Sequence, residues 1–420
     1  MNKVLIITYY WPPGGGAGVQ RWLKFSKYLP QFGWEPVILT VEPDYAAYPV
    51  YDNSLLSEIS GDLEVYKTKT IDYFRLYRKD KTKIPSAGFA GNNDTSLKGK
   101  LFRFIRGNFF IPDPRKGWNR FAFREACRII ETKNVNHVIT TSPPHSTQLI
   151  GLRLKKKYPS IKWISDLRDP WTDIYYYDLF YPTFISRKID RQYERSVLLN
   201  ADIITTIGSA LGRQYELKAK GIGSKIKIIH NGYDDSDFEN IKPVMAERFT
   251  ISYTGTISDS YPVDGFVKAL QRLIKDGHDI LFRFTGLLPE SQKEYIRSSI
   301  EMNHLEFISY AEHKDAIAQM VASSLLLLVI ARHPGNRSFL SGKLYEYIAS
   351  GKPVLCLGPV DGDAAEILND TGCGKCFSYY DEAGIAEFVL SIMGRQSVSG
   401  QTRPVKYSRK YLAEQMASLL

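Results

Sequence analysis

The sequence predicts an α/β protein with two successive domains, each built on a parallel β-sheet. The chain has 420 residues, which is more than one hydrophobic core usually holds. Short apolar runs alternate with longer amphipathic segments across Gly, Pro and Ser turns, a pattern typical of parallel strands joined by right-handed crossovers. The same series starts again after a polar connector near residues 235–248, where we place the domain boundary.

The first predicted domain covers residues 1–240. We expect strands at 3–8, 36–40, 137–141, 162–165, 202–206 and 225–229, and helices at 19–30, 118–132, 146–157 and 184–200. The second domain covers 241–404, with strands at 250–254, 280–285, 305–309, 325–331 and 353–358 and helices between them. A final helix at 405–420 follows an irregular stretch, and we expect it to pack back on the first domain.

A basic insertion at about 67–120 carries the charge asymmetry of the chain. Between Lys67 and Arg120 there are 14 Lys and Arg against four Asp, a surplus equal to the net charge of +10. Aromatic residues alternate with arginine in part of this segment, which is typical of contact with an anionic membrane surface. A solvated insertion is the alternative, and nucleic acid is not expected because no nucleic-acid-binding module accompanies the charge.

The sequence predicts a cytoplasmic protein. The first apolar run lacks the features of a secretory signal, and the longest run, at 325–331, has strand length. Cys373 and Cys376 have no second pair at zinc spacing, so we interpret the four cysteines as structural.

A glycine-rich loop follows the first strand, at the edge of the sheet where ligands collect. Gly15 and Gly16 precede a predicted helix whose N-terminus favours an anion or a closely approaching sugar. The spacing of the glycines excludes a dinucleotide fingerprint and a Walker loop. A tight turn with no ligand is the alternative interpretation.

Polar clusters follow other strands of the first domain. His145 comes after the third strand, and Arg168 and Asp169 come after the fourth, within "SDLRDPW". Because these strand ends share one edge with the glycine loop, we take these residues as candidate site residues. The acidic run at 234–237 is interpreted as a turn, and no metal site is predicted.

The second domain contains a segment suited to a diphosphate. Arg332 follows a strand, Arg337 lies in the next loop, and Lys343 lies in the first turn of a helix, where a cation and a helix dipole act together. Glu346 lies three residues further on nearly the same helical face, where a carboxylate can accept ribose hydroxyls.

In this order these segments resemble the retaining glycosyltransferases of the GT-B fold, specifically the family-4-like group that makes bacterial polysaccharides and lipid-linked glycans. The matching stretches are "PPGGGAGVQR", "SDLRDPW", "IIHNGYD", "ISYTGTI" and "GKLYEYIASGKPVL". The resemblance implies two Rossmann-like domains facing each other across a cleft, with the acceptor on the first and the nucleotide-sugar donor on the second.

The resemblance also implies roles for individual residues. It places Gly15 and Gly16 near the donor phosphates and sugar, His145 near the transferred sugar, and Glu346 at the ribose. Together with the residues argued above, the catalytic candidates are His145, Asp169 and Lys343, and the substrate-binding candidates are Gly15, Gly16, Arg21, Arg168, Arg332, Arg337 and Glu346. Two positions depart from the family pattern. Ser338 stands where the first acidic residue of a Glu-x7-Glu motif is expected, and "TGTISDSYPVDG" lacks the usual Arg and Lys.

The function that the resemblance implies is a metal-independent, retaining transfer of a sugar from a nucleoside-diphosphate sugar to a glycan or lipid-linked acceptor. The donor is a substrate, and no cofactor is expected. The basic insertion would hold the enzyme at the inner face of a membrane. Two alternatives stay open: a nucleotide-sugar epimerase of the same fold, and a non-catalytic member that binds glycan or membrane.

Overall fold

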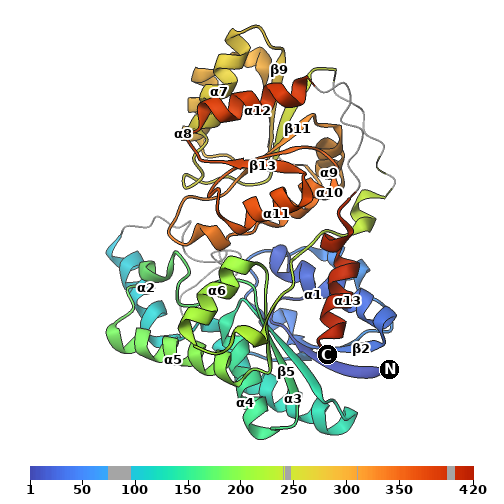
Figure 1. Cartoon of the computed structure of the whole chain (residues 1–420). Helices are drawn as coiled ribbons and strands as arrows, with labels where there is room; N and C mark the ends of the chain where they lie inside the picture. The colour runs from blue at the N-terminus through green and yellow to red at the C-terminus, as the bar shows by residue number, and fades with distance from the viewer. Residues whose placement is uncertain (74–95, 240, 242–246, 310, 395–402) are drawn as a thin grey trace. The chain divides into compact units, whose positions relative to one another are not determined.

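The computed structural model describes residues 1–73, 96–239, 241, 247–309, 311–394 and 403–420 (Figure 1). The chain divides into two units: Met1–His230 with Arg409–Leu420, and Asn231–Ser408. We call them the N-terminal domain and the C-terminal domain. Much of the predicted basic insertion, at 74–95, lies outside the described residues.

The N-terminal domain contains a parallel sheet in the order β3-β2-β1-β4-β5-β6-β7. Its strands are β1 (Asn2–Ile7), β2 (Trp34–Val41), β3 (Glu64–Thr68), β4 (His137–Ser142), β5 (Lys162–Leu167), β6 (Ile203–Thr206) and β7 (Ile226–Ile228). β1 pairs in parallel with both β2 and β4. Its residues Val4 to Ile7 are fully buried because helices cover both faces of the sheet.

Helices connect these strands. They are α1 (Ala17–Tyr28), α2 (Leu97–Phe109), α3 (Asn119–Lys133), α4 (Gln148–Lys157), α5 (Phe184–Asn200) and α6 (Ser209–Lys218). The helix α13 (Arg409–Ser418) completes this domain, because Leu412, Ala413 and Met416 share a buried cluster with Trp22 of α1. The expectation that the last helix packs on the first domain is confirmed.

The C-terminal domain contains a parallel sheet in the order β10-β9-β8-β11-β12-β13. Its strands are β8 (Phe249–Thr254), β9 (Ile280–Thr285), β10 (Leu305–Ile308), β11 (Leu325–Val329), β12 (Val354–Leu357) and β13 (Gly374–Phe377). Its helices are α7 (Asp264–Lys275), α8 (Glu290–Ser299), α9 (His313–Ala322), α10 (Gly342–Ala349), α11 (Asp363–Thr371) and α12 (Glu382–Met393). The two sheets confirm the predicted fold class.

Strands β3 and β13 and helices α2, α6, α11 and α12 were not predicted from the sequence. The edge strand β3 has no fully buried residue, and β13 has four residues beginning with glycine, so neither gives a clear apolar signal. Helix α2 carries two glycines, Gly99 and Gly107, within an arginine-rich stretch. Gly107 is required there, because a β-carbon would overlap the carbonyl oxygen of Phe180.

Candidate functional sites at the two switch points

Each sheet has one point where the strand order reverses. In the N-terminal domain this point lies between β1 and β4, and in the C-terminal domain between β8 and β11. Ligands of open parallel sheets bind outside the carboxyl ends of the strands at such points. The predicted site residues follow these strands or their neighbours.

Lys343 of α10 lies against Gly255 at the C-terminal switch point. Gly255 follows β8 with a φ of 115°, and a β-carbon there would overlap the Cε atom of Lys343. The Lys343 Nζ atom donates a hydrogen bond of 3.1 Å to the Tyr253 hydroxyl and lies 5.0 Å from the centre of the Tyr253 ring. The side chain of Lys343 therefore runs from α10 across the end of β8.

The ammonium group of Lys343 is held in surroundings that disfavour its charge. Burial lowers the pKa of Lys343 to about 8, and Glu346 on the same helix partly opposes this shift. An ammonium group has three donors, and within the described part of the chain one of them is engaged, by Tyr253. An anion placed here would gain a charge-assisted hydrogen bond and would restore the ordinary pKa of the lysine.

The start of α10 is capped by its own sequence. The Ser341 hydroxyl accepts the backbone N–H of Lys343, and the Ser341 carbonyl accepts that of Leu344. The helix dipole still favours an anion at this end. Ser338, at the position of the missing acidic residue, is 5% exposed and donates a hydrogen bond to the Gly335 carbonyl. A buried carboxylate would be costly in that place.

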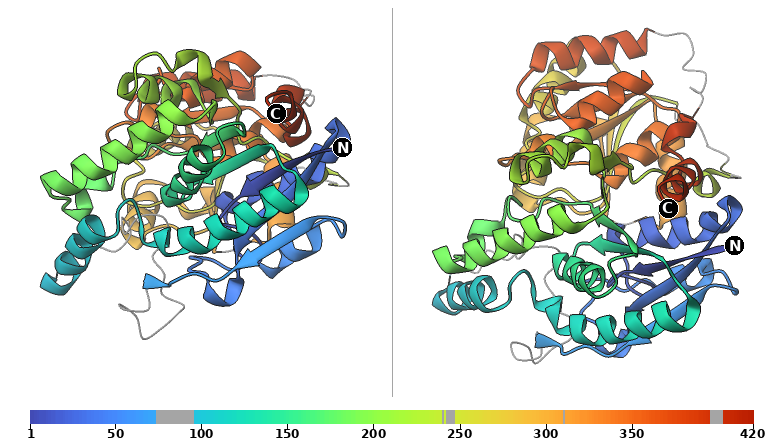
Figure 2. Two further views of the ribbon diagram at one scale, coloured as in Figure 1. Left: turned by 90° about the horizontal axis from the view of Figure 1, so that it is seen from below. Right: turned by 60° about the horizontal axis from the view of Figure 1, so that its bottom comes forward.

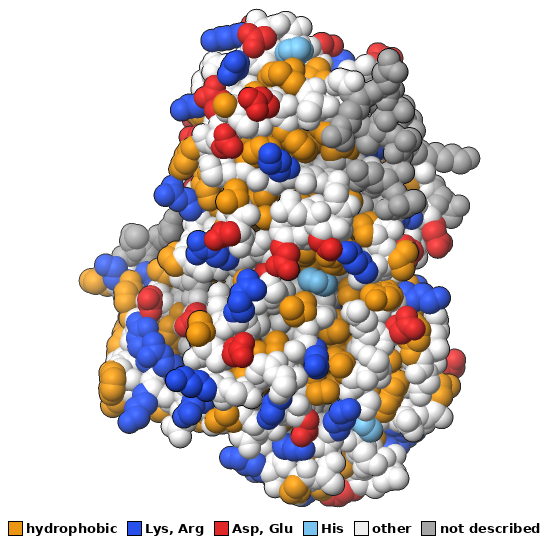
Figure 3. Space-filling model, viewed as in Figure 1, with side chains coloured by type: hydrophobic (Ala, Val, Ile, Leu, Met, Phe, Trp, Pro, Cys, Tyr) orange, Lys and Arg blue, Asp and Glu red, His pale blue; other side chains and the backbone are white. Residues whose placement is uncertain are grey.

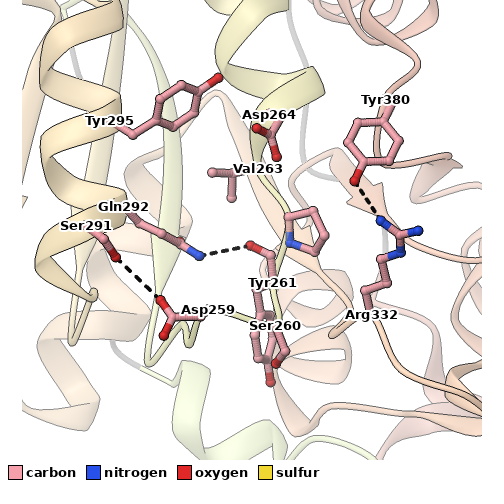
Figure 4. Close-up of a pocket in the computed structure, with 11 residues that line it drawn as sticks. Asp259, Ser260, Tyr261, Val263, Asp264, Ser291, Gln292, Tyr295, Arg332 and Tyr380 are labelled. Carbon is pink, nitrogen blue, oxygen red and sulfur yellow. Dashed lines mark hydrogen bonds between the residues drawn. The ribbon is translucent and has the colours of Figure 1, made fainter.

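A cavity of about 440 Å³ opens beside the loop that follows β8 (Figure 4). Its lining includes the carboxylates Asp259 and Asp264, the rings of Tyr261 and Tyr380, and Arg332. Arg332 donates a hydrogen bond of 2.8 Å to the Tyr380 hydroxyl, and its backbone N–H bonds to the Ser260 carbonyl. Two carboxylates beside one guanidinium suit a hydroxyl-bearing group better than a diphosphate.

Arg337 lies on the surface of the C-terminal domain. Its Nε atom is 2.8 Å from the carboxylate of Asp361, and both side chains are more than half exposed. Exposed ion pairs of this kind are weak and exchange easily. Its role in substrate binding remains a prediction.

The glycine loop of the N-terminal domain is shaped by packing within the domain. The Gly15 N–H donates to the Val50 carbonyl, and a β-carbon on Gly15 would press against Asp52 and Val50. Gly16 has a φ of 86° and caps α1 without any side-chain hydrogen bond. Gly16 is exposed, and no atom lies within 4 Å of where its β-carbon would be. Packing within the domain is therefore enough to favour glycine at position 15. At position 16 the glycine leaves open space beside the start of α1.

His145 is oriented by the segment after β5. Its Nε2 atom lies 3.2 Å from the Pro170 carbonyl, and its ring stacks on Trp171 at 4.9 Å between ring centres. Because a carbonyl can only accept, Nε2 carries the proton and Nδ1 is the acceptor. Burial lowers the pKa of His145 to about 4, so the ring is neutral near pH 7. Nδ1 has no hydrogen-bond partner in the described part of the chain.

Arg168 is 5% exposed. It lies beside the Asp166 carboxylate, which already accepts hydrogen bonds from other side chains. Its Nε atom donates to the Ser142 carbonyl and is 4.0 Å from Asp166, while Nη2 has no partner among the described residues. Burial lowers the pKa of Arg168, and it raises the pKa of the Asp169 carboxyl, which is half-buried. The catalytic role of Asp169 remains a prediction.

Arg21 occupies the interior of the N-terminal domain. It is 2% exposed, its Nη2 atom is 3.0 Å from Asp166, and its Nη1 atom donates to the His230 carbonyl. Asp166 also accepts from Trp22, Thr141 and Thr205. Arg21 therefore holds α1 to β5, and its role in substrate binding remains a prediction.

Sequence reasoning missed Tyr253, Gly255 and Trp171 as parts of these sites. All three lie in stretches that the resemblance had marked, "ISYTGTI" and "SDLRDPW". Their roles depend on side chains that meet across distant positions, and this could not be predicted from spacing.

Among the helices of the described ranges, none has the length and apolar character needed to cross a membrane. The same residues contain no group of three or more His, Cys, Asp or Glu side chains placed to hold a metal ion.

Solved structures similar to this chain cover nearly its whole length. One is a glycosyltransferase from Rickettsia africae ESF-5, with a TM-score of 0.63 and 15% identity over 100% of this chain and 97% of that chain. A sucrose-phosphate synthase from Thermosynechococcus elongatus has a TM-score of 0.62 and 13% identity over 100% of this chain and 98% of that chain. A putative UDP-N-acetylglucosamine 2-epimerase from Listeria monocytogenes has a TM-score of 0.54 and 12% identity over 99% of this chain and 94% of that chain.

No protein-family model matches the sequence, and no curated protein matches it. Likeness at these identities concerns the fold, and the neighbours include transferases and epimerases. With its two Rossmann-like domains, each built on a parallel sheet, the chain has the GT-B fold.

Proposed function

We propose that the protein is a glycosyltransferase that moves a sugar from a nucleoside-diphosphate sugar to a glycan or lipid-linked acceptor, with the anomeric configuration retained and without a metal. The fold supports a transferase, since glycosyltransferases are among the structural neighbours. One neighbour with this fold was solved in complex with UDP and glucose. A lipid-linked acceptor would place the enzyme at the cytoplasmic face of a membrane.

The chemistry of such a transfer asks for positive charge at the departing diphosphate. Lys343 meets this requirement by burial, by its unused donors and by its place in the first turn of α10. Lys343 would also take the place of the Arg and Lys that are usual after β8 and absent here, because its side chain reaches the end of that strand from α10. Glu346 would accept the ribose hydroxyls, and Arg332 would contact the donor from the cavity.

The N-terminal switch point supports an acceptor or sugar site. His145 is neutral with a lone pair on Nδ1, so it can accept a hydrogen bond from a hydroxyl but cannot serve as a strong acid near pH 7. Arg168 is buried beside Asp166, which is already paired with Arg21, and it is also influenced by the Asp169 carboxylate. Its Nη2 atom, which has no partner among the described residues, would donate a hydrogen bond to an oxygen of the ligand. No protein nucleophile is proposed.

The observation that carries the proposal is the buried Lys343 ammonium at the C-terminal switch point. We would test it by thermal denaturation with a series of nucleoside diphosphates. A ligand at saturating concentration should raise the melting temperature by about 5 °C or more. Lys343→Met, which keeps the apolar stem, and Glu346→Gln should lose most of this shift.

Lys352→Met is the matched control, because burial also lowers the pKa of Lys352 just beyond the end of α10. This variant should keep the wild-type response. If no nucleoside diphosphate stabilises the protein, or if the Lys343 variant responds like wild type, the donor-site assignment is wrong.

An epimerase is the second candidate, because putative or named epimerases are among the structural neighbours. Incubation with an isotopically labelled donor alone separates the two reactions, since epimerisation requires no acceptor. A non-catalytic glycan-binding or membrane-binding protein is the third candidate. It is favoured if saturating nucleotides leave the melting temperature unchanged while a glycan or a vesicle binds.

A further inference from the structure

Helices α2 and α5 together expose an apolar surface that is rich in positive charge. They lie side by side in the N-terminal domain (Figure 2). The α2–α5 surface consists of Leu97, Lys98, Lys100, Leu101 and Phe109 of α2 and Phe184, Ile185, Lys188, Ile189 and Arg191 of α5. Leu97 is 84% exposed, Phe184 is 80% exposed and Ile185 is 69% exposed. Large apolar side chains this exposed, on two helices that contact each other, mark a contact surface.

The charged residues of this surface are lysines and arginines, and the exposed acid beside it, Asp178, is paired with Arg187. Helix α2 has four Lys and Arg and no acidic residue. Helix α5 also has four Lys and Arg, and its two acidic residues, Asp190 and Glu194, are 3% and 1% exposed. Figure 3 shows blue and orange side chains gathered over this end of the N-terminal domain.

The buried acids of α5 are used inside the domain. Asp190 accepts hydrogen bonds from Trp171 Nε1 and the Tyr177 hydroxyl. Glu194 accepts from the Thr172 hydroxyl and from Lys218. They are therefore directed away from solvent, and the exposed face of α5 keeps its arginines and lysines without acidic neighbours on the same helix.

The two helices form one preformed surface. Asn108 of α2 donates to the Tyr181 carbonyl and accepts from the Thr183 backbone N–H and the Ser186 hydroxyl at the start of α5. The guanidinium of Arg106 also lies 4.7 Å from the centre of the Phe180 ring. These contacts fix both helices before any partner binds, so little ordering is lost on contact.

We propose that the α2–α5 surface docks on a lipid bilayer that contains anionic lipids. Its apolar side chains enter the interfacial region and its lysines and arginines lie at the headgroups. The core of a protein interface is depleted of lysine, whereas here Lys98, Lys100 and Lys188 are interspersed along the two helices with exposed apolar residues. The proposal stands on this surface alone and does not require the proposed transferase reaction.

Co-sedimentation of the full chain with vesicles tests the proposal. The protein should sediment with vesicles of equal parts phosphatidylcholine and phosphatidylglycerol, and far less with phosphatidylcholine alone. Raising salt from about 0.1 M to about 0.5 M should release it, because the headgroup attraction is screened. Each Lys→Gln change at Lys98, Lys100 or Lys188 should weaken partitioning about five-fold.

Leu97→Asn should weaken binding to the mixed vesicles as well. Leu217→Asn on α6 is the matched control, because Leu217 is also 84% exposed but lies outside this surface. It should bind like wild type. Both substitutions are at exposed positions, so folding should be retained, and melting temperatures of the two variants should agree with wild type.

Three outcomes would overturn the proposal. They are no sedimentation with either vesicle, equal sedimentation with both vesicles, and a change in oligomeric state on Leu97→Asn with unchanged vesicle binding. The last would identify a protein partner instead. Nucleotide-induced stabilisation measured on the same variants should be unaltered, so loss of the donor site and loss of the membrane surface can be distinguished.

Discussion

The side chain of Lys343 lies across the α-carbon of Gly255, so a β-carbon at residue 255 would occupy the place of the lysine Cε atom. The two residues are on different elements, the first turn of α10 and the end of β8. A residue with no side chain is therefore needed at position 255 for a cation to reach the end of β8.

Gly255→Ala should abolish nucleoside-diphosphate binding by displacing Lys343. The control is Gly277→Ala: Gly277 also has a positive φ, of 91°, but no atom lies within 4 Å of the added carbon. Both variants should lose about 1 kcal/mol or more of stability through backbone strain. Only the first should lose binding in isothermal titration. Equal affinities in the two variants would show that the Lys343 position is unimportant for the ligand.

Nucleotide affinity should decrease as the pH rises above about 8. Burial lowers the pKa of Lys343 to about 8, so the ammonium form that attracts a diphosphate is lost above that value. We expect a constant dissociation constant between about pH 7 and 7.5 and a rise approaching ten-fold per pH unit well above pH 8. Lys343→Met should bind weakly with no such inflection. An unchanged pH profile in this variant would assign the inflection to another group.

Arg21→Met should destabilise the N-terminal domain by about 3–5 kcal/mol, because it leaves the Asp166 carboxylate buried beside fewer positive charges. Arg128→Met, which removes an exposed pair with Glu125, should cost no more than about 0.5 kcal/mol. Urea denaturation gives both values. If the Arg21 variant keeps its stability but loses affinity for the substrate, a role for Arg21 in substrate binding is supported instead.

Stability should decrease as the pH falls below about 6.5, in part because of His145. Burial lowers the folded-state pKa of His145 from 6.5 to about 4, so in this interval the unfolded chain binds a proton that the folded chain does not. The resulting slope is at most about 1.4 kcal/mol per pH unit. His145→Asn should have a shallower slope between pH 6.5 and 5 in urea denaturation. Parallel curves for the two proteins would indicate that His145 titrates normally.

Much of the fold could be predicted because apolar runs and turns are local signals. The strand β11, Leu325–Val329, is fully buried and reads as a continuous apolar run. The strand β13, Gly374–Phe377, was missed because it is short and half-exposed at its start, and only pairing with β12 fixes it. Short edge strands depend on neighbours that a local pattern does not contain.

The candidate sites could be predicted at the level of which strand ends carry them. His145 follows β4 and the glycine loop follows β1, and these two strands are neighbours in the sheet. The contacts of Arg21 could not be foreseen, since its partner Asp166 is 145 residues away and both side chains are buried. Likewise, the direction of the Lys343 side chain toward Gly255 depends on how α10 packs on the sheet. The apolar periodicity of this helix does not determine that packing.

The return of the last helix to the first domain has a consequence for synthesis. Leu412 and Met416 complete a core that includes Trp22, so a nascent chain can form that core fully only when residues 409–420 have left the ribosome. The C-terminal domain, by contrast, has all its residues available earlier. The N-terminal domain should therefore finish folding after the C-terminal domain.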